Sequence, residues 1–173
     1  MRKYLVFFSL LAAFTTSAAD ALKLPAREKF HLFLLVGQSN MAGRGKVTPA
    51  DKKPIDRVLM LTKDDKWQPA VAPLHFDKPK VVGVGIGRAF AKEMAKGDPD
   101  VTIGLIPCGV GGSPIDSWKT GVFYKPTKSH PWDDALRRAK LALKAGTLKG
   151  ILWHQGESDS KAGLAESYEK KLH

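Results

Sequence analysis

The sequence is poor in cysteine, because its 173 residues contain only one, Cys108. A single cysteine cannot form an internal disulfide, a redox pair or a cysteine-rich metal site. We interpret Cys108 as a small buried apolar group at the end of a strand. The acidic residues also lack the clustering by which phosphodiesterases and nucleases hold metal ions. No metal and no other cofactor is predicted.

The sequence also lacks an apolar run long enough to remain in a membrane. The run at residues 4–14 has about eleven residues, whereas a bilayer-spanning helix needs roughly 20. Arg2 and Lys3 precede this run, and small residues around Ala19 follow it. This pattern is typical of a signal peptide, here over residues 1–19. We therefore predict a secreted or periplasmic protein without stable membrane insertion after cleavage. A retained N-terminal anchor is the alternative.

Acidic residues are few beside the basic ones. The chain has 28 Lys and Arg residues against 17 Asp and Glu residues, and a net charge of +11. The basic residues are spread along the chain and do not alternate with aromatics in a stripe, so nucleic acid is not a predicted partner. We interpret the charge as solvated surface. Attraction to an anionic polysaccharide or to the cell envelope is the weaker alternative.

Three apolar runs have the length and flanks of buried parallel strands, at residues 31–36, 101–106 and 150–153. Apolar residues at helical spacing lie between them, over residues 86–94 and 132–143. This alternation predicts an α/β fold, a three-layer αβα sandwich around a parallel flavodoxin-like sheet, with its site at the carboxyl ends of the strands. Residues 43–80 are interpreted as an insertion or long loop with one short strand-like run at residues 57–61.

A polar loop with glycine follows each predicted strand. The first, G-Q-S-N-M at residues 37–41, is a tight turn that would expose the Ser39 hydroxyl beside backbone N–H groups able to hold an oxyanion. The second, residues 108–118, contains Gly111 and Gly112, whose amides can approach a ligand without side chains in the way. The third, residues 153–159, reads W-H-Q-G-E-S-D. The carboxyl edge of a parallel sheet would bring the three loops together.

The three loops together resemble the blocks of the SGNH hydrolases, in the variant found in sialate O-acetylesterases and family-six carbohydrate esterases. The matching segments are G-Q-S-N-M-A-G, G-G-S-P-I-x-x-W and W-x-Q-G-E-S-D, in this order between Phe30 and Asp159. The resemblance implies a serine esterase that removes acetyl groups from carbohydrate, with xylan, sialic acid and other acetylated glycans all open as substrates. It implies an SGNH-type domain over residues 28–173.

Roles for individual residues follow from this resemblance. Ser39 would be the nucleophile, Gly112 an oxyanion-hole amide with Gly111 as the alternative, and Gln155 a side-chain donor to the same oxyanion. The supporting or substrate-binding positions would be Gln38, Asn40, Gly111 and Glu157. Glu157 is expected to brace the first loop by accepting hydrogen bonds. A direct acid–base role is its alternative.

The sequence departs from the family pattern in one respect, because it has no D-x-x-H block to supply the catalytic histidine and its aspartate. His173 has Lys170 three positions before it. His154 neighbours Gln155, and strand alternation would turn the two side chains apart. We therefore expect the catalytic base beyond residue 173, in a domain whose C-terminal strands are missing and whose strand at residues 150–153 is left as an edge.

Two other readings remain. The run V-G-V-G-I-G at residues 82–87 has the spacing G-x-G-x-G, and Arg88 occupies the place of the last glycine in a dinucleotide-binding motif. We interpret it as a helix entrance beside the cleft. A catalytically silent carbohydrate-binding module on the same fold is the rival from another class. Only an activated serine would react with a serine-directed probe, which separates that rival from an esterase.

Overall fold

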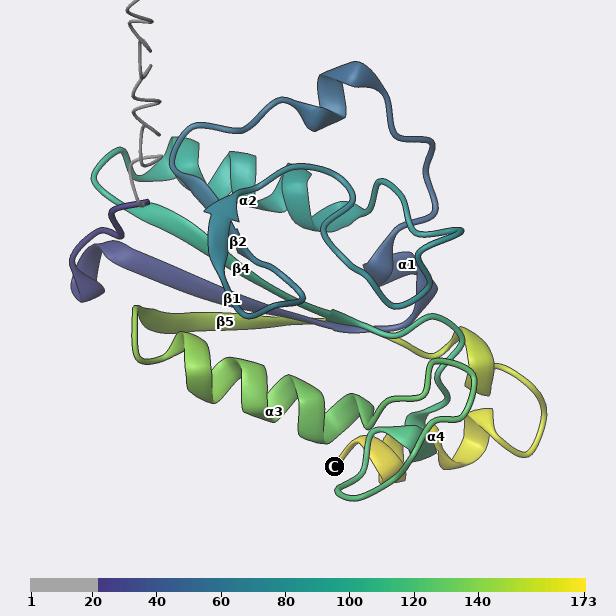
Figure 1. Ribbon diagram of the computed structural model, residues 1–173. Coiled ribbons are helices and arrows are strands. Elements are labelled where there is room, and N and C mark those ends of the chain that lie inside the picture. Colours follow the sequence, from purple (N-terminus) through teal and green to yellow (C-terminus); the bar gives the residue numbers. More distant parts are fainter. Residues whose placement is uncertain (1–21) are drawn as a thin grey trace, which may run out of the picture.

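The structure is a computed structural model that describes residues 22–173, and the predicted signal peptide lies outside this range. One sheet of five strands runs through the centre of the molecule, in the order β3-β2-β4-β1-β5 (Figure 1). All neighbouring strands are parallel except β2 and β3, which are antiparallel. The strands are β1 (Phe30–Gly37), β2 (Val58–Leu61), β3 (Trp67–Pro69), β4 (Thr102–Gly109) and β5 (Thr147–His154).

The three predicted strands are β1, β4 and β5, and they are direct neighbours in the sheet. The other two strands come from the segment that was interpreted as a long loop, so that interpretation was only partly right. The strand-like run at residues 57–61 is β2, which pairs with β4, and β3 then pairs with β2 at the edge. These strands have only four and three residues, too few to show a clear alternation.

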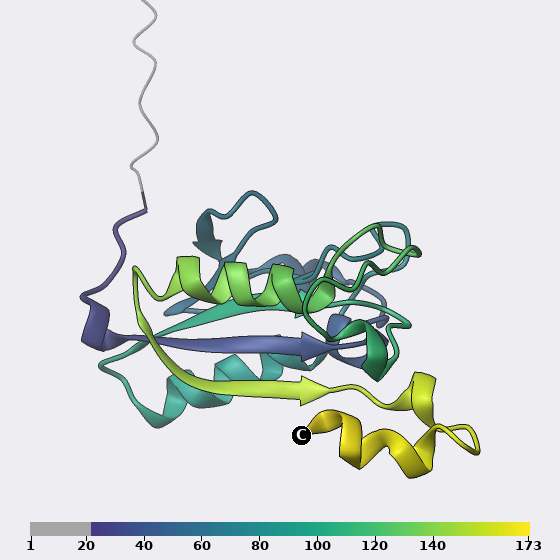
Figure 2. The ribbon, with the colours of Figure 1, turned by 90° about the horizontal axis from the view of Figure 1, so that it is seen from below.

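Helices cover both faces of the sheet, as predicted for a three-layer sandwich (Figure 1). Helix α2 (Ile86–Gly97) lies on one face and α3 (Pro131–Ala142) on the other. Helix α1 (Ser39–Ala42) is one turn directly after β1, and α4 (Ala165–Leu172) lies near the carboxyl end of β5 (Figure 2). Four 3-10 turns complete the described chain: η1 (Arg27–Lys29), η2 (Pro49–Lys52), η3 (Ile115–Ser117) and η4 (Glu157–Asp159).

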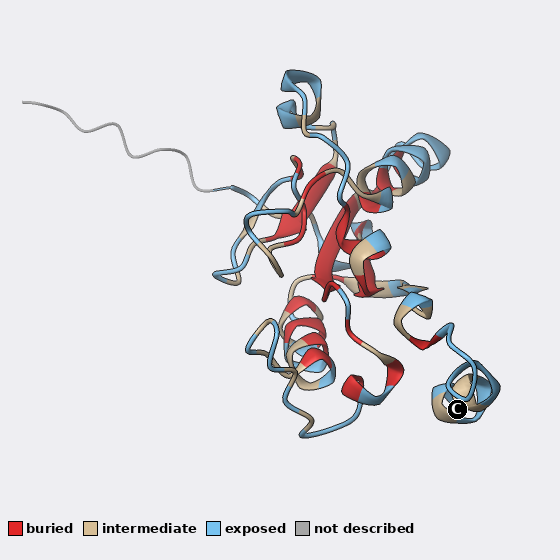
Figure 3. Ribbon diagram, turned by 90° about the vertical axis from the view of Figure 1, so that its right-hand side faces the viewer, coloured by how far each residue is buried: buried red, intermediate tan, exposed pale blue. Residues whose placement is uncertain are grey.

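The core has two halves, one on each face of the sheet. Along β1 the side chains alternate: Phe30, Leu32 and Leu34 pack into the cluster beside α3, whereas Phe33 and Leu35 pack into the cluster beside α2. Successive residues of a strand point to opposite faces, and both faces of β1 are buried. Figure 3 shows this burial concentrated in the central strands. The central strand thus reads as a continuous apolar run because it contributes to both halves of the core.

Strand β5 lies at one end of the sheet and pairs only with β1, so the prediction that it is an edge strand is confirmed. Its residues are half-buried or exposed throughout, and Ile151 is 59% exposed, so the prediction that residues 150–153 form a buried strand was wrong as to burial. The reason is that β5 has a neighbouring strand on one side only. Among residues 22–173, the structure has no helix that is both long enough and apolar enough to cross a membrane.

Candidate active site

The carboxyl ends of three strands are aligned in the sheet. Gly37, the last residue of β1, lies opposite Gly109 of β4 on one side and His154 of β5 on the other. The three polar loops identified in the sequence therefore leave the sheet side by side. Backbone bonds join them directly, because Gln38 N–H donates to His154 O at 2.9 Å and Val110 N–H to Gly37 O at 2.7 Å. This arrangement is the one that the parallel-strand argument predicted.

The first loop makes an abrupt turn from β1 into α1. Gly37 has a φ of +132°, and a Cβ there would lie 2.0 Å from His154 O, so no other residue fits without displacement. Ser39 begins α1 and is half-buried, while Met41 and Ala42 anchor the turn in the core. No acceptor for the Ser39 N–H is found in the described part of the chain. The nucleophile predicted from the sequence therefore carries an unengaged amide beside its own hydroxyl.

The second loop leaves one backbone N–H unengaged among five. Within residues 109–113, four amides donate inside the protein: Gly109 to His75 Nδ1 at 2.9 Å, Val110 to Gly37 O at 2.7 Å, Gly111 to Asp77 Oδ2 at 2.7 Å and Ser113 to Val110 O at 3.2 Å. Gly112 has a φ of +80°, and its N–H has no acceptor among residues 22–173. The Gly111 N–H thus already has an acceptor whereas the Gly112 N–H has none among residues 22–173, and the oxyanion role of either glycine stays a prediction.

The third loop is held by the side chain of Gln155. Its Nε2 atom lies within hydrogen-bond distance of Gln38 Oε1 at 3.2 Å, Ser113 O at 3.0 Å and Asp159 Oδ2 at 2.6 Å. Its Oε1 accepts from Tyr168 Oη at 2.6 Å. An amide NH2 has two N–H bonds, so these acceptors already occupy both. The oxyanion role of Gln155 stays a prediction, and it requires one of these acceptors to be released when substrate binds.

Gln38 and Asp159 are buried polar residues that complete this network. Gln38 Oε1 also accepts from Ser158 N–H at 3.2 Å, and Asp159 Oδ2 accepts from Ile115 N–H at 2.9 Å. Gln38 therefore belongs to the machinery that fixes the loops, as its predicted supporting role requires. The sequence signal for Asp159 was its place at the end of the W-x-Q-G-E-S-D block, although no role had been assigned to it.

Glu157 lies between two neighbours at the exposed side of the site. Its Oε1 accepts a hydrogen bond from Asn40 Nδ2 of the first loop, and His154 Nε2 lies 3.6 Å from the same oxygen. The bond to Asn40 is the contact that the bracing interpretation of Glu157 expects. His154 ends β5 and has Glu157 as its neighbour, whereas Gln155 contacts Gln38 and Ser113, and the alternation argument stays a prediction. Whether Glu157 also acts as an acid or base stays a prediction.

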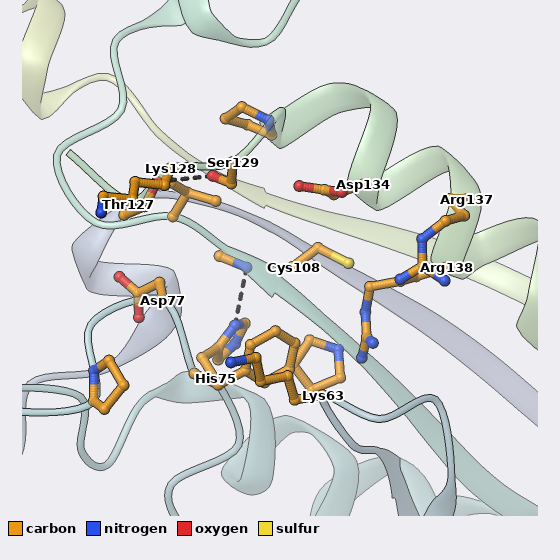
Figure 4. Close-up of a pocket in the computed structure, with 16 residues that line it drawn as sticks. Lys63, His75, Asp77, Cys108, Thr127, Lys128, Ser129, Asp134, Arg137 and Arg138 are labelled. Carbon is orange, nitrogen blue, oxygen red and sulfur yellow. Dashed lines mark hydrogen bonds between the residues drawn. The ribbon is translucent and has the colours of Figure 1, made fainter. Parts of the chain in front are cut away.

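Three residues beside the second loop had been given no role there by the sequence reasoning: Arg44, His75 and Asp77. They come from the segment taken as a loop, and no spacing in the sequence links them to residues 109–111. A cavity of about 460 Å³ lies beside the end of β4. His75 and Asp77 are among the residues that line it (Figure 4). Burial lowers the pKa of His75 to about 4.

Cys108 lines the same cavity (Figure 4). Cys108 is buried at the second-to-last position of β4, which confirms the prediction of a small buried group at a strand end. Burial also raises the pKa of its thiol to about 11, which leaves the thiol protonated and unreactive at neutral pH.

The glycines of residues 82–87 serve close backbone packing. A Cβ on Gly83 would lie 2.0 Å from Gly45 O, and one on Gly85 would lie 2.9 Å from Met41 O. Gly85 is the N-cap of α2, so the interpretation of this run as a helix entrance is confirmed. In the described residues, no group of three His, Cys, Asp or Glu side chains gathers in a way that could hold a metal ion.

The mostly parallel sheet, with helices on both faces and three polar loops at the carboxyl ends of neighbouring strands, defines the class as an α/β protein with a candidate site at that edge of the sheet. The family model of the sialic acid-specific acetylesterases, described as carbohydrate esterases, matches residues 29–173. The chain belongs to this carbohydrate esterase family.

Similar proteins agree with this assignment. A probable carbohydrate esterase of Arabidopsis thaliana is 39% identical in an alignment 148 residues long, and the alignment covers 74% of this chain and 54% of that protein. The chain therefore spans about half the length of this curated relative. A solved Arabidopsis thaliana structure has a TM-score of 0.72 at 36% identity, and covers 82% of this chain and 64% of its own.

Two more distant structures share the fold. NanS has a TM-score of 0.59 at 20% identity, covering 86% of this chain and 64% of its own. A carbohydrate acetylesterase from Xanthomonas citri has a TM-score of 0.58 at 19% identity, covering 82% of this chain and 36% of its own. The mostly parallel five-stranded α/β fold is thus common to this chain and to carbohydrate esterase structures.

Proposed function

We propose that the chain forms part of a serine esterase that removes O-acetyl groups from carbohydrate through an acetyl-serine intermediate. The observation that carries this proposal is the pair of unengaged amides, those of Ser39 and Gly112, on neighbouring loops at the carboxyl edge of the sheet. Membership of a carbohydrate esterase family supports an acetyl ester as the substrate. Acetylated xylan, acetylated sialic acids and other acetylated glycans all fit this chemistry.

In the proposed mechanism Ser39 Oγ attacks the acetyl carbonyl carbon and loses its proton to a base. The carbonyl oxygen becomes an oxyanion, to which the amides of Ser39 and Gly112 donate. The sugar oxygen then leaves with the proton, and water attacks the acetyl-serine to release acetate and restore Ser39. These 173 residues contain no D-x-x-H block, and the proposal does not assign the base to any of them.

Gln155 and Glu157 have supporting roles in this proposal. Gln155 would turn one N–H from Ser113 O or Gln38 Oε1 toward the oxyanion as the intermediate forms. Glu157 would hold Asn40, and through it the turn that carries Ser39. Secretion or export to the periplasm, proposed from residues 1–19, would bring such an esterase to polysaccharide.

The decisive substitution is Ser39→Ala, tested in this chain and in a version extended through any downstream D-x-x-H block. Acetate release from acetylated xylan and acetylated sialic acid should fall at least about a thousandfold in the extended version. Its thermal unfolding should be unchanged. Ser167→Ala is the matched control, because Ser167 lies on α4 and, within residues 22–173, its Oγ hydrogen-bonds only to Leu164 O.

A serine-directed phosphonate separates the esterase from the silent carbohydrate-binding module. Labelling of Ser39 in the parent protein, absent from the Ser39→Ala variant, supports an activated nucleophile. Binding of acetylated glycan with neither labelling nor hydrolysis in the extended version would assign the chain to the binding module. Normal hydrolysis by the Ser39→Ala variant would exclude Ser39 as the nucleophile.

A further inference from the structure

A buried histidine contacts the peptide chain just before Gly112. His75 is only 4% exposed, and its Nδ1 accepts the Gly109 N–H at 2.9 Å (Figure 4). The ring fills the space in front of Gly109, because a Cβ added there would lie 3.0 Å from Nδ1. His75 thereby fixes the peptide with which β4 ends.

The bond to Gly109 defines the protonation state of the ring. A nitrogen that accepts a hydrogen bond carries no proton, so His75 is neutral with its hydrogen on Nε2. Burial favours this state most strongly, and the nearby guanidinium groups of Arg138 and Arg44 also lower the pKa, whereas the Asp77 carboxylate raises it. A protonated ring would place an N–H against the Gly109 N–H and break the contact.

Asp77 makes the equivalent contact two residues further along. Its Oδ2 accepts the Gly111 N–H at 2.7 Å and the Arg44 Nη2 donor at 2.8 Å, and its side chain is only 2% exposed. Arg44 follows the first loop, so this ion pair also joins the first loop to the second. His75 and Asp77 thus accept hydrogen bonds from Gly109 and Gly111. In each of the two segments, the residue in between is skipped.

We propose that His75 and Asp77 are positioning residues of the oxyanion hole: they engage the amides of Gly109 and Gly111, and so orient the unengaged Gly112 N–H toward the acetyl group on Ser39. This proposal rests on the proposed esterase function. The burial of polar atoms without hydrogen-bond partners argues for such a role. Among residues 22–173, His75 Nε2 and Asp77 Oδ1 are buried without a hydrogen-bond partner, a cost that apolar side chains would avoid.

The substitutions His75→Asn and His75→Leu separate positioning from packing. The Asn Oδ1 atom can take the place of Nδ1 and accept from Gly109, whereas Leu offers no acceptor. In the extended version of the protein, we expect His75→Leu to lower kcat for acetyl-ester hydrolysis about tenfold or more, with KM changed less than about twofold. His75→Asn should restore most of kcat. His31→Leu, at the opposite end of the sheet, is the matched control and should leave kcat unchanged.

Amide NMR of this chain supplies a readout that does not depend on catalysis. The Gly109, Gly111 and Gly112 signals should shift together on acidification with a midpoint near pH 4, and this step should be absent in His75→Asn. The proposal is overturned if His75→Leu keeps full kcat, or if His75→Asn lowers kcat as much as His75→Leu does. It is also overturned if the Gly112 amide signal does not shift when His75 is protonated. If His75→Leu does not fold, the Asn variant and the pH titration decide. Hydrolysis that is absent even in the extended parent would reject the esterase function, while the titration still tests the contact between His75 and the loop.

Discussion

Strands β4 and β5 are both eight residues long and both end in a loop of the proposed site, yet their surroundings differ. β4 lies between β2 and β1, and all but its first residue are buried. β5 has β1 on one side only and contains no fully buried residue. Position in the sheet, rather than length or apolar content, therefore decides how much each strand contributes to the core.

The loops after these strands are held in different ways. The loop after β4 is fixed from outside by two buried side chains, His75 and Asp77, which accept from its backbone. The loop after β5 is fixed by its own side chains, chiefly Gln155 and Asp159, which reach to the other loops. The first loop is held in both ways, because Gln38 contacts Gln155 and Arg44 pairs with Asp77. A loop on a buried strand can be braced by the core, whereas one on an edge strand must carry its own hydrogen-bonding groups.

Among the changes that compare the two loops, the largest effect is expected from Gln155→Ala, which removes the centre of the network after β5. In the extended version we expect kcat for acetyl-ester hydrolysis to fall about 100-fold to 1,000-fold, with a much smaller change in KM, because an oxyanion bond forms mainly in the transition state. Steady-state kinetics on an acetylated sugar measures both values. A drop in thermal stability with kcat unchanged would instead show that Gln155 only connects the loops and does not stabilise the oxyanion.

The burial difference between the strands is tested by Leu105→Ala in β4 and Ile151→Ala in β5. Leu105 is fully buried, and its truncation should lower the free energy of unfolding by about 3 kcal/mol. Ile151 is 59% exposed, and its truncation should cost less than about 1 kcal/mol. Urea unfolding of the two variants gives the comparison. Equal losses would mean that β5 is covered in solution by something outside residues 22–173.

Acid should weaken the loop after β4 through protonation of His75. The unfolded chain takes up a proton on His75 near pH 6.5, but the folded chain only near pH 4. His75 therefore contributes stability at neutral pH that is lost as the pH falls from about 6.5 to about 4, amounting to at most about 3 kcal/mol. Unfolding free energies of the parent and of His75→Asn across this range measure the effect. A parent curve that is flat there, or one parallel to that of the variant, would contradict the prediction.

The smallest effect on stability is expected from Ile151→Lys, which places a charge on the open edge of β5. The free energy of unfolding should change by less than about 0.5 kcal/mol, while aggregation of the 173-residue chain should decrease, because a charged edge resists strand addition. Light scattering during storage measures aggregation.

A version extended beyond residue 173 should aggregate less than the parent chain and release more acetate. If the parent chain equals it in both, the base lies within these residues and His154 becomes the leading candidate.

Much of the fold and of the site could be predicted from local patterns. The apolar runs of β1 and β4 are continuous because both faces of these strands are buried, and the shorter apolar run of β5 is visible although that strand is only partly covered. The loops that follow them also carry recognisable blocks, so Ser39, Gly112 and Gln155 could be named. The strands β2 and β3 could not be predicted with the same clarity, because four and three residues are too few to define a period.

The tertiary structure alone decided which atoms of those loops are engaged and which are left unengaged. Gly111 and Gly112 are adjacent and chemically identical in the sequence, and only the approach of Asp77 from 34 residues away separates their N–H groups. In the same way, only the packing of three loops shows that the Gln155 amide already has partners within the protein. Residue type and spacing are local properties of a chain, but hydrogen-bond satisfaction depends on contacts between distant segments that form only on folding.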